Sequence, residues 1–158
     1  MKLPAFLTET RLNWLGLFVR LILGGVIFVA GALKVTAPYK AAAAMRAYEL
    51  LPISVANILG YTLPWFEVGV GILLILGIAT RLSAIFAGSL MVIFILAIAS
   101  AWARGLSIDC GCFGGGGQVA PGETKYLQEI LRDFGLTLLA VYLYLRPHTK
   151  WALEPASR

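Results

Sequence analysis

Charged residues are scarce in this sequence, and it contains only one histidine and two cysteines. Asp, Glu, Lys and Arg make up 13% of the 158 residues, about half the fraction of a typical soluble domain. A soluble domain needs a polar surface to face water, so this scarcity argues against an ordinary soluble fold. Hydrophobic residues make up 59% of the chain, and most of its surface must therefore be covered by lipid or by partner protein.

The sequence also lacks a basic run or a basic helix face, although its net charge is +5. Lys and Arg stand singly at the ends of apolar segments, which is the pattern of membrane proteins. We therefore expect no nucleic-acid partner. No small-residue cleavage site follows the first apolar run, so we expect that run to be an uncleaved membrane helix and not a signal peptide.

The long apolar segments predict an all-α, polytopic membrane protein: a bundle of four transmembrane helices that forms one integral membrane domain over residues 1–158. A helix of about 20 residues crosses roughly 30 Å of hydrocarbon. The predicted spans cover about residues 14–34, 58–79, 82–103 and 125–145. The last span contains Glu129, Arg132 and Asp133, and we expect these side chains to face the bundle interior.

Two segments between the spans have a different character. Residues 39–51 are rich in alanine with interspersed charges, which predicts a short interfacial helix on the membrane surface. Residues 105–122 form a long irregular segment with a Cys-Gly-Cys sequence at 110–112 and four consecutive glycines at 114–117. The glycines make this loop mobile and able to fold closely over another element.

Both cysteines lie in this loop, separated only by Gly111. A disulfide between Cys110 and Cys112 would close a small strained ring, and strained, exposed disulfides are the more oxidising and labile ones. This favours a role in thiol–disulfide exchange. The alternatives are an inert buried pair, a purely structural disulfide and a Cu(I) site made by the two thiolates. We expect no zinc site, because zinc takes four ligands and His148 is predicted at the opposite membrane face.

Four ionisable residues are predicted in the same leaflet as the cysteine pair: Lys34, Glu67, Arg132 and Asp133. Charge inside a span is costly, so each such residue is a functional candidate. We expect a polar pocket beneath the loop. Arg132 or Lys34 would stabilise a thiolate there, and Glu67 or Asp133 would carry protons. The alternative is a structural ion-pair network that fixes the packing of the helices.

Four spans place both termini on one side of the membrane. Lys and Arg are divided equally between the two predicted sides, with Lys2 and Arg158 counted on the terminal side, so the positive-inside rule gives little direction. The basic C-terminal tail favours cytoplasmic termini. The cysteine loop then faces outward, where disulfides persist. This predicts a multi-pass protein of the inner or plasma membrane with an extracytoplasmic cysteine loop.

Five short motifs follow one another along the chain at residues 31–34 (GALK), 48–52 (YELLP), 63–67 (LPWFE), 77–81 (GIATR) and 110–114 (CGCFG). In their order and spacing the sequence resembles the DoxX-like superfamily of small four-helix membrane proteins, and within it the MauE branch. The resemblance covers nearly the whole chain, and its most specific part is the cysteine motif.

The resemblance implies a redox-associated membrane protein. MauE proteins are linked to methylamine utilisation and to disulfide formation in the small subunit of methylamine dehydrogenase, alongside a thioredoxin-like partner. This sequence departs from the family pattern early in the fourth helix, where Arg132-Asp133 replaces an expected Arg-Asn. The acid adds a charge to the predicted pocket.

We therefore expect a thiol–disulfide oxidoreductase component, in which Cys110 and Cys112 pass electrons between an extracytoplasmic thioredoxin-like partner and a membrane carrier such as a quinone. No covalently bound cofactor is expected. A complete quinone-linked disulfide generator uses a second cysteine pair, so we expect a partner, in a homo- or hetero-oligomer. The rival interpretations are a Cu(I)-handling membrane protein and a non-catalytic DoxX-type subunit of a membrane redox complex.

Overall fold

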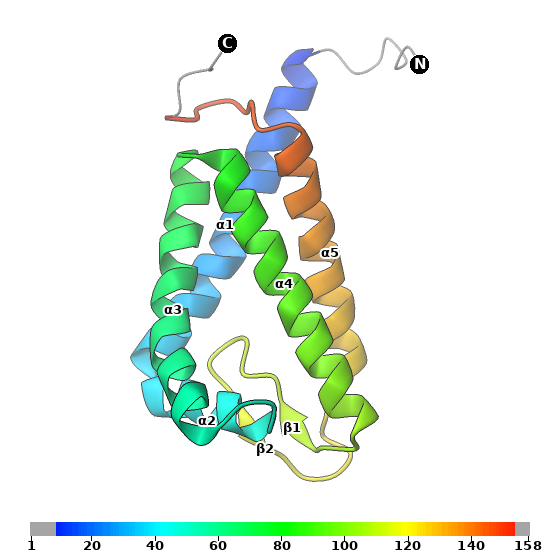
Figure 1. Cartoon of the computed structure of the whole chain (residues 1–158). Helices are drawn as coiled ribbons and strands as arrows, with labels where there is room; N and C mark the ends of the chain where they lie inside the picture. The colour runs from blue at the N-terminus through cyan, green and yellow to red at the C-terminus, as the bar shows by residue number, and fades with distance from the viewer. Residues whose placement is uncertain (1–8, 154–158) are drawn as a thin grey trace.

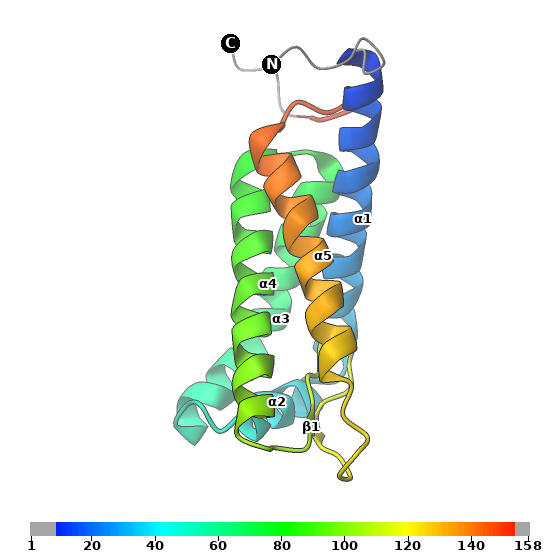
Figure 2. The same cartoon turned by 90° about the vertical axis from the view of Figure 1, so that its right-hand side faces the viewer.

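The structure is a computed structural model that describes residues 9–153. Lys2 and Arg158, which entered the charge comparison, lie outside these residues. The described chain forms the helices α1 (Glu9–Thr36), α2 (Pro38–Ala47), α3 (Ile53–Leu76), α4 (Thr80–Ala103) and α5 (Tyr126–Leu145), and the strands β1 (Ile108–Asp109) and β2 (Gly117–Gln118). The long helices α1, α3, α4 and α5 run alongside one another, and α2 and the strands lie at one end (Figures 1 and 2).

Three helices are long and apolar enough to cross a membrane: Thr10–Thr36, Ile53–Leu76 and Thr80–Ala103. Their outer faces expose large apolar side chains such as Phe18, Trp65 and Leu96, which suit contact with lipid. Helix α5 is not among these three, so the predicted fourth span stays a prediction.

The ends of the helices follow local residue chemistry. Pro38 starts α2, where its missing N–H costs no hydrogen bond. Helix α3 begins at Ile53, directly after Pro52 and five residues before the start of the predicted span. It ends at Leu76 because Gly77 takes a left-handed conformation with φ 69°. The short helix ends at Ala47, four residues before the end of the predicted segment.

Helices α1 and α3 approach each other closely at glycines. A Cβ atom at Gly31 would lie 2.8 Å from the Pro64 carbonyl oxygen and 2.8 Å from the Val68 backbone nitrogen. A Cβ atom at Gly71 would lie 2.7 Å from the backbone nitrogen of Phe28. These positions admit only glycine at this spacing, which agrees with the packing role expected of small residues in membrane helices.

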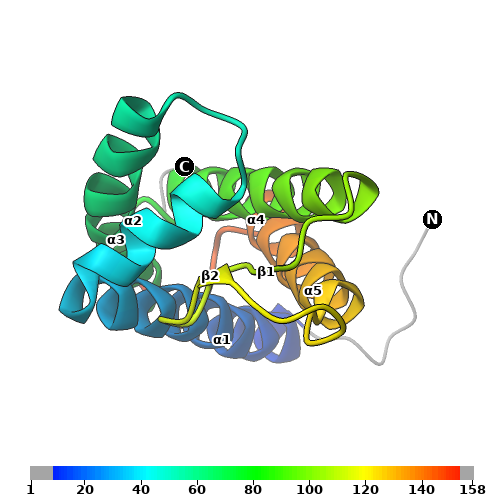
Figure 3. The same ribbon diagram turned by 90° about the horizontal axis from the view of Figure 1, so that it is seen from below.

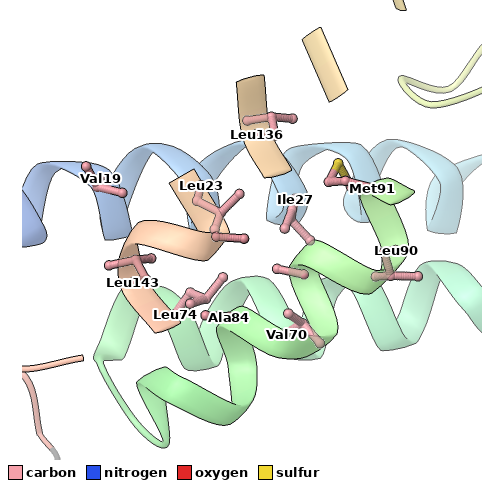
Figure 4. Packing of buried hydrophobic residues seen from close by; sticks show 12 residues of the cluster. Val19, Leu23, Ile27, Val70, Leu74, Ala84, Leu90, Met91, Leu136 and Leu143 are labelled. Atoms are coloured by element: carbon pink, nitrogen blue, oxygen red, sulfur yellow. The ribbon is translucent and has the colours of Figure 1, made fainter. Parts of the chain in front are cut away.

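An apolar core lies between the long helices. Its residues come from α1, α3, α4 and α5, and Figure 4 shows Leu23, Leu74 and Leu143 pointing toward one another from three of them. A second cluster of buried residues contains Tyr48, both cysteines and Tyr126, and it lies at the α2 end of the molecule. The core therefore holds the helices, and the second cluster positions the cysteine loop.

Arg20 of α1 is a buried cation whose partners lie in the segment that follows α5. It is only 1% exposed. Its Nη1 donates to Thr149 Oγ1 at 2.7 Å and its Nη2 donates to the Trp151 carbonyl at 3.2 Å. The residues that follow α5 fold back over the end of the helices and supply these partners.

Candidate functional site

Cys110 and Cys112 form a disulfide at the α2 end of the molecule. The strands β1 and β2 pair in antiparallel register, Ile108 with Gln118 and Asp109 with Gly117, and so close the loop that carries both cysteines. Seen from below, this loop lies beside α2 and between the ends of α1, α4 and α5 (Figure 3). The disulfide therefore has a defined place against the helix ends.

The disulfide is buried, with Cys110 9% and Cys112 7% exposed, whereas the redox interpretation of the sequence rested on an exposed disulfide. The disulfide is buried because the cysteine loop packs closely against α2. Gly111 has a positive φ of 72°, and a Cβ atom there would lie 2.6 Å from Ala44 Cβ. Glycine is thus required at this position by its backbone conformation and by its contact with α2.

Hydrogen bonds from two tyrosines hold the loop in place. Tyr126 Oη donates to the Leu106 carbonyl at 2.6 Å and accepts from the Ile108 N–H at 3.1 Å. Tyr48 Oη donates to the Cys110 carbonyl at 3.4 Å. Burial, reinforced by nearby carboxylates, raises the pKa of Tyr48 and keeps its phenol a neutral hydrogen-bond donor.

Arg132 lies next to the disulfide. Its Nη2 is 4.0 Å from Cys110 Sγ, and its guanidinium lies 4.9 Å from the centre of the Phe113 ring. The same guanidinium donates to Asp133 Oδ1 at 2.9 Å. A positive charge at this distance would stabilise a thiolate on Cys110.

Lys34 and Glu67 form a buried ion pair between α1 and α3, with Lys34 Nζ 2.7 Å from the Glu67 carboxylate. Both residues are buried, and the close helix packing at Gly31 brings their backbones together. The Lys34 ammonium also lies 5.3 Å from the centre of the Phe94 ring. Its charge is therefore balanced within the protein interior.

These groups meet at a small cavity of about 20 Å³, which has room for about one water molecule. Its polar lining consists of Lys34, Glu67, Cys112, Arg132 and Asp133. Asp133 is 1% exposed, and its Oδ2 has no hydrogen-bond partner among the described residues. The residues that the sequence assigned to one leaflet therefore surround one cavity next to the disulfide, and Cys110 lies just outside it.

The profile of the family described as "Methylamine utilisation protein MauE" matches residues 12–146. The chain belongs to the MauE family. The resemblance stated from the sequence motifs is thus confirmed, and with three membrane-compatible helices the molecule is a membrane protein.

A relative of this MauE-family chain is the methylamine utilization protein MauE of Methylorubrum extorquens, which is 38% identical over 73 residues. The match covers 46% of this chain and 39% of that protein. The chain therefore matches well under two thirds of the length of its curated relative. No solved structure is significantly similar to the chain.

Within residues 9–153, the MauE-family site also offers one group of potential metal ligands. The ligand atoms of Asp109, Cys110 and Glu129 lie within 4.8 Å of one another. Cys110 is disulfide-bonded, so its sulfur is not available as a thiolate ligand in this state. In the oxidised protein the two carboxylates of this group are therefore left without the thiolate.

Sequence reasoning missed four aromatic residues at this site, one of which is Tyr126. Tyr48 bonds the Cys110 backbone, Phe113 stacks on Arg132, and Phe94 faces Lys34. A signal existed for two of them, because Tyr48 begins the 48–52 motif and Phe113 belongs to the cysteine motif. Nothing local distinguishes Phe94 from the other apolar residues of α4.

Proposed function

We propose that this MauE-family protein is a membrane component of thiol–disulfide exchange. The Cys110 and Cys112 pair passes electrons between an extracytoplasmic thioredoxin-like protein and a carrier in the membrane. The observation that carries the proposal is the Arg132 guanidinium, 4.0 Å from Cys110 Sγ, beside a disulfide that borders a buried polar cavity. A disulfide with only a structural role would need neither the cation nor the acids.

The exchange reaction proceeds through a mixed disulfide. In the reduced protein the Cys110 thiolate attacks the disulfide of the partner and releases one partner thiolate. Cys112 then attacks the mixed disulfide, the Cys110–Cys112 bond forms, and the partner leaves as a dithiol. Oxidation of the partner is the reverse of these steps. Arg132 stabilises the thiolate on Cys110, and Asp133 exchanges a proton with Cys112 across the small cavity.

A protein partner reaches the disulfide only when the cysteine loop moves, because both cysteines of this loop are buried. Glycines at 111, 114, 116 and 117 have positive φ values. Such positions allow the loop to change its backbone conformation at low steric cost. The loop thus limits access to the sulfur atoms until a partner binds.

We propose that α5 is the fourth membrane span. Four large apolar residues stand along one side of this helix at helical spacing and are all exposed: Leu127, Leu131, Phe134 and Leu138. The opposite side carries the buried Asp133. Four spans would place both ends of the described chain on one side of the membrane. We propose that this side is the cytoplasm and that the cysteine loop lies outside the plasma membrane, where an oxidised pair persists.

Membership of the MauE family supports a role in methylamine utilisation, the process named for the Methylorubrum extorquens relative. A disulfide-bearing enzyme of that process would be the final recipient of the exchanged disulfides. The thioredoxin-like protein would then carry the disulfides between this membrane protein and that enzyme.

The test is the redox state of Cys110 and Cys112 in intact cells, trapped with a membrane-impermeant thiol reagent before and after a mild reductant. We expect the pair to cycle between disulfide and dithiol and to be labelled from outside. A Cys112→Ser variant should retain its partner as a mixed disulfide, and the Cys110→Ser/Cys112→Ser double variant is the matched control.

Thiols that stay reduced, or that react only from the cytoplasm, would contradict the proposal. Retention of copper by those thiols would then favour the metal-handling interpretation. If a membrane redox complex stays active with the Cys110→Ser/Cys112→Ser variant, the interpretation as a non-catalytic subunit would be favoured instead.

A further inference from the structure

A second and larger cavity, of about 250 Å³, lies between α2, α3, α4 and the cysteine loop. Its lining is mostly apolar and includes Leu50, Leu59, Leu63, Leu90, Ile93 and Ala97. Cys110, Gly111 and Cys112 also line it. The disulfide therefore borders an apolar cavity whose volume is slightly below that of typical small-molecule sites.

This cavity is continuous with the apolar outer surface of the molecule. Helices α3 and α4 are joined by a tight turn at one end and diverge toward the α2 end (Figure 1). Leu59 of α3 and Ile93 of α4 line the cavity and are 36% and 58% exposed. An apolar molecule in the bilayer can thus enter between these two helices without passing through water.

The polar groups of the cavity are few and lie near the disulfide. Lys34 lines both this cavity and the small one, as do Phe94 and Cys112. The Lys34 ammonium has three donors, and the Glu67 carboxylate engages part of them at 2.7 Å. Tyr48, a neutral phenol, also lines the cavity.

From this arrangement we infer that the larger cavity binds a membrane quinone, which enters between α3 and α4 and is reduced there by the Cys110 and Cys112 dithiol. This inference rests on the proposed function and names the carrier. A quinone has a flat apolar ring, a carbonyl oxygen that accepts a hydrogen bond from Lys34, and an apolar tail that remains in the bilayer. A lipid acyl chain would fill the same volume but would use neither the donors nor the sulfur atoms.

The chemical step balances without another reactant. The two cysteine S–H bonds break and one S–S bond forms, which releases two electrons and two protons. The quinone takes up both, so that its two carbonyls become hydroxyls and it leaves as the quinol. Lys34 donates a proton to the nearer carbonyl oxygen and recovers one through Glu67 and the small cavity, which Cys112 also lines.

The test uses the full chain in phospholipid nanodiscs that contain no quinone. The probe is a short-tailed benzoquinone with a photoreactive group, and the measurement is its cross-linking to the protein, mapped by mass spectrometry. We expect attachment to the residues of α3 and α4 that line the cavity. An isoprenoid alcohol, which has the apolar tail but no quinone ring, should not compete with the probe for cross-linking.

Ala97→Phe fills the cavity, whereas Ala99→Phe adds the same ring to the exposed side of α4 and is the matched control. The added ring takes up volume that the quinone would occupy, so we expect Ala97→Phe to bind the probe about tenfold more weakly and Ala99→Phe to bind it within about twofold of the parent protein. Thermal unfolding of both variants identifies loss of fold.

Two results would overturn the inference. One is cross-linking of the probe to residues outside the cavity, which can be measured with the parent protein alone. The other is equal competition by the isoprenoid alcohol, which would identify a lipid site. In either case the proposed function still stands if the Cys110–Cys112 pair exchanges its disulfide with a soluble dithiol. If the probe binds in the cavity but the Cys110–Cys112 pair never changes its redox state, both the proposed function and the reduction of a quinone are contradicted.

Discussion

The charged residues near the disulfide have their partners inside the protein. Lys34 contacts Glu67 at 2.7 Å, and Arg132 contacts Asp133 at 2.9 Å. A buried ion pair brings little net stability, because the cost of removing both charges from water offsets their attraction. Stability alone therefore does not account for these charges in an apolar chain. Arg132 differs from Lys34 in that its guanidinium also reaches a sulfur atom.

Replacing Arg132 tests whether this cation acts on the sulfur. Loss of a charge-assisted interaction of about 1–2 kcal/mol should slow exchange of the reduced pair with a small disulfide about tenfold in Arg132→Gln. The rate should also rise at a higher pH than in the parent protein, because less of Cys110 is a thiolate at a given pH. The measurement is the exchange rate as a function of pH, and Arg132→Lys should recover part of the rate.

Arg81→Gln provides the matched control, since Arg81 lies against Tyr144 at the other end of the molecule. The rate and pH profile of that variant should equal those of the parent protein. Arg132→Gln with an unchanged pH profile would assign Arg132 a purely structural role.

Among the elements, the packing of α1 on α3 decides where Lys34 meets Glu67. The two helices approach most closely at Gly31, where Pro64 and Val68 supply the facing backbone atoms. A proline inside α3 leaves one backbone carbonyl without its usual donor, yet the helix continues through Pro64. The close contact at Gly31 lies within four residues of Lys34 on α1 and of Glu67 on α3, so it brings these two side chains together.

Gly31→Ala should separate the two helices. Its Cβ atom would lie 2.8 Å from two backbone atoms of α3, which cannot rotate away. Overpacking of this kind costs about 1–3 kcal/mol, and we expect a lower Tm in thermal unfolding of the purified protein. Gly25→Ala is the matched control, because nothing lies within 4 Å of a Cβ atom there. Equal Tm values for the two variants would show that the close contact is not required.

For the whole molecule, the order of the helices brings together residues from opposite ends of the chain. Lys34, Glu67, Cys112 and Asp133 border one cavity, although they belong to α1, α3, the cysteine loop and α5. The apolar core formed by the same long helices holds these elements in fixed positions (Figure 4). The site is thus a property of the assembled helices and not of any one segment.

The proposed fourth span is testable with single cysteines in the Cys110→Ser/Cys112→Ser background. Glu123→Cys precedes α5 and His148→Cys follows it, and both positions are exposed. We expect a membrane-impermeant thiol reagent to label Glu123→Cys in intact cells and His148→Cys only after the cells are opened. Labelling of both variants from the same side would show that α5 does not cross the membrane.

The sequence by itself determined the class of the protein and the chemistry available to it. Low charge and long apolar segments predicted membrane helices, and three helices of the required length and hydropathy are present. These are local properties: hydrophobic runs, prolines and Gly77 set helix positions and ends without reference to the rest of the chain. The family was likewise recognised from short motifs, and residues 12–146 match it.

Only the tertiary structure decided how the predicted site residues meet. Their shared leaflet followed from their depth in each helix, but the pairing of Lys34 with Glu67 and of Arg132 with Asp133 depends on how the helices rotate against one another. Burial of the cysteines depends on the contact of Gly111 with Ala44, and the larger cavity depends on the divergence of α3 from α4. Such contacts join residues far apart in the chain, and no local pattern specifies them.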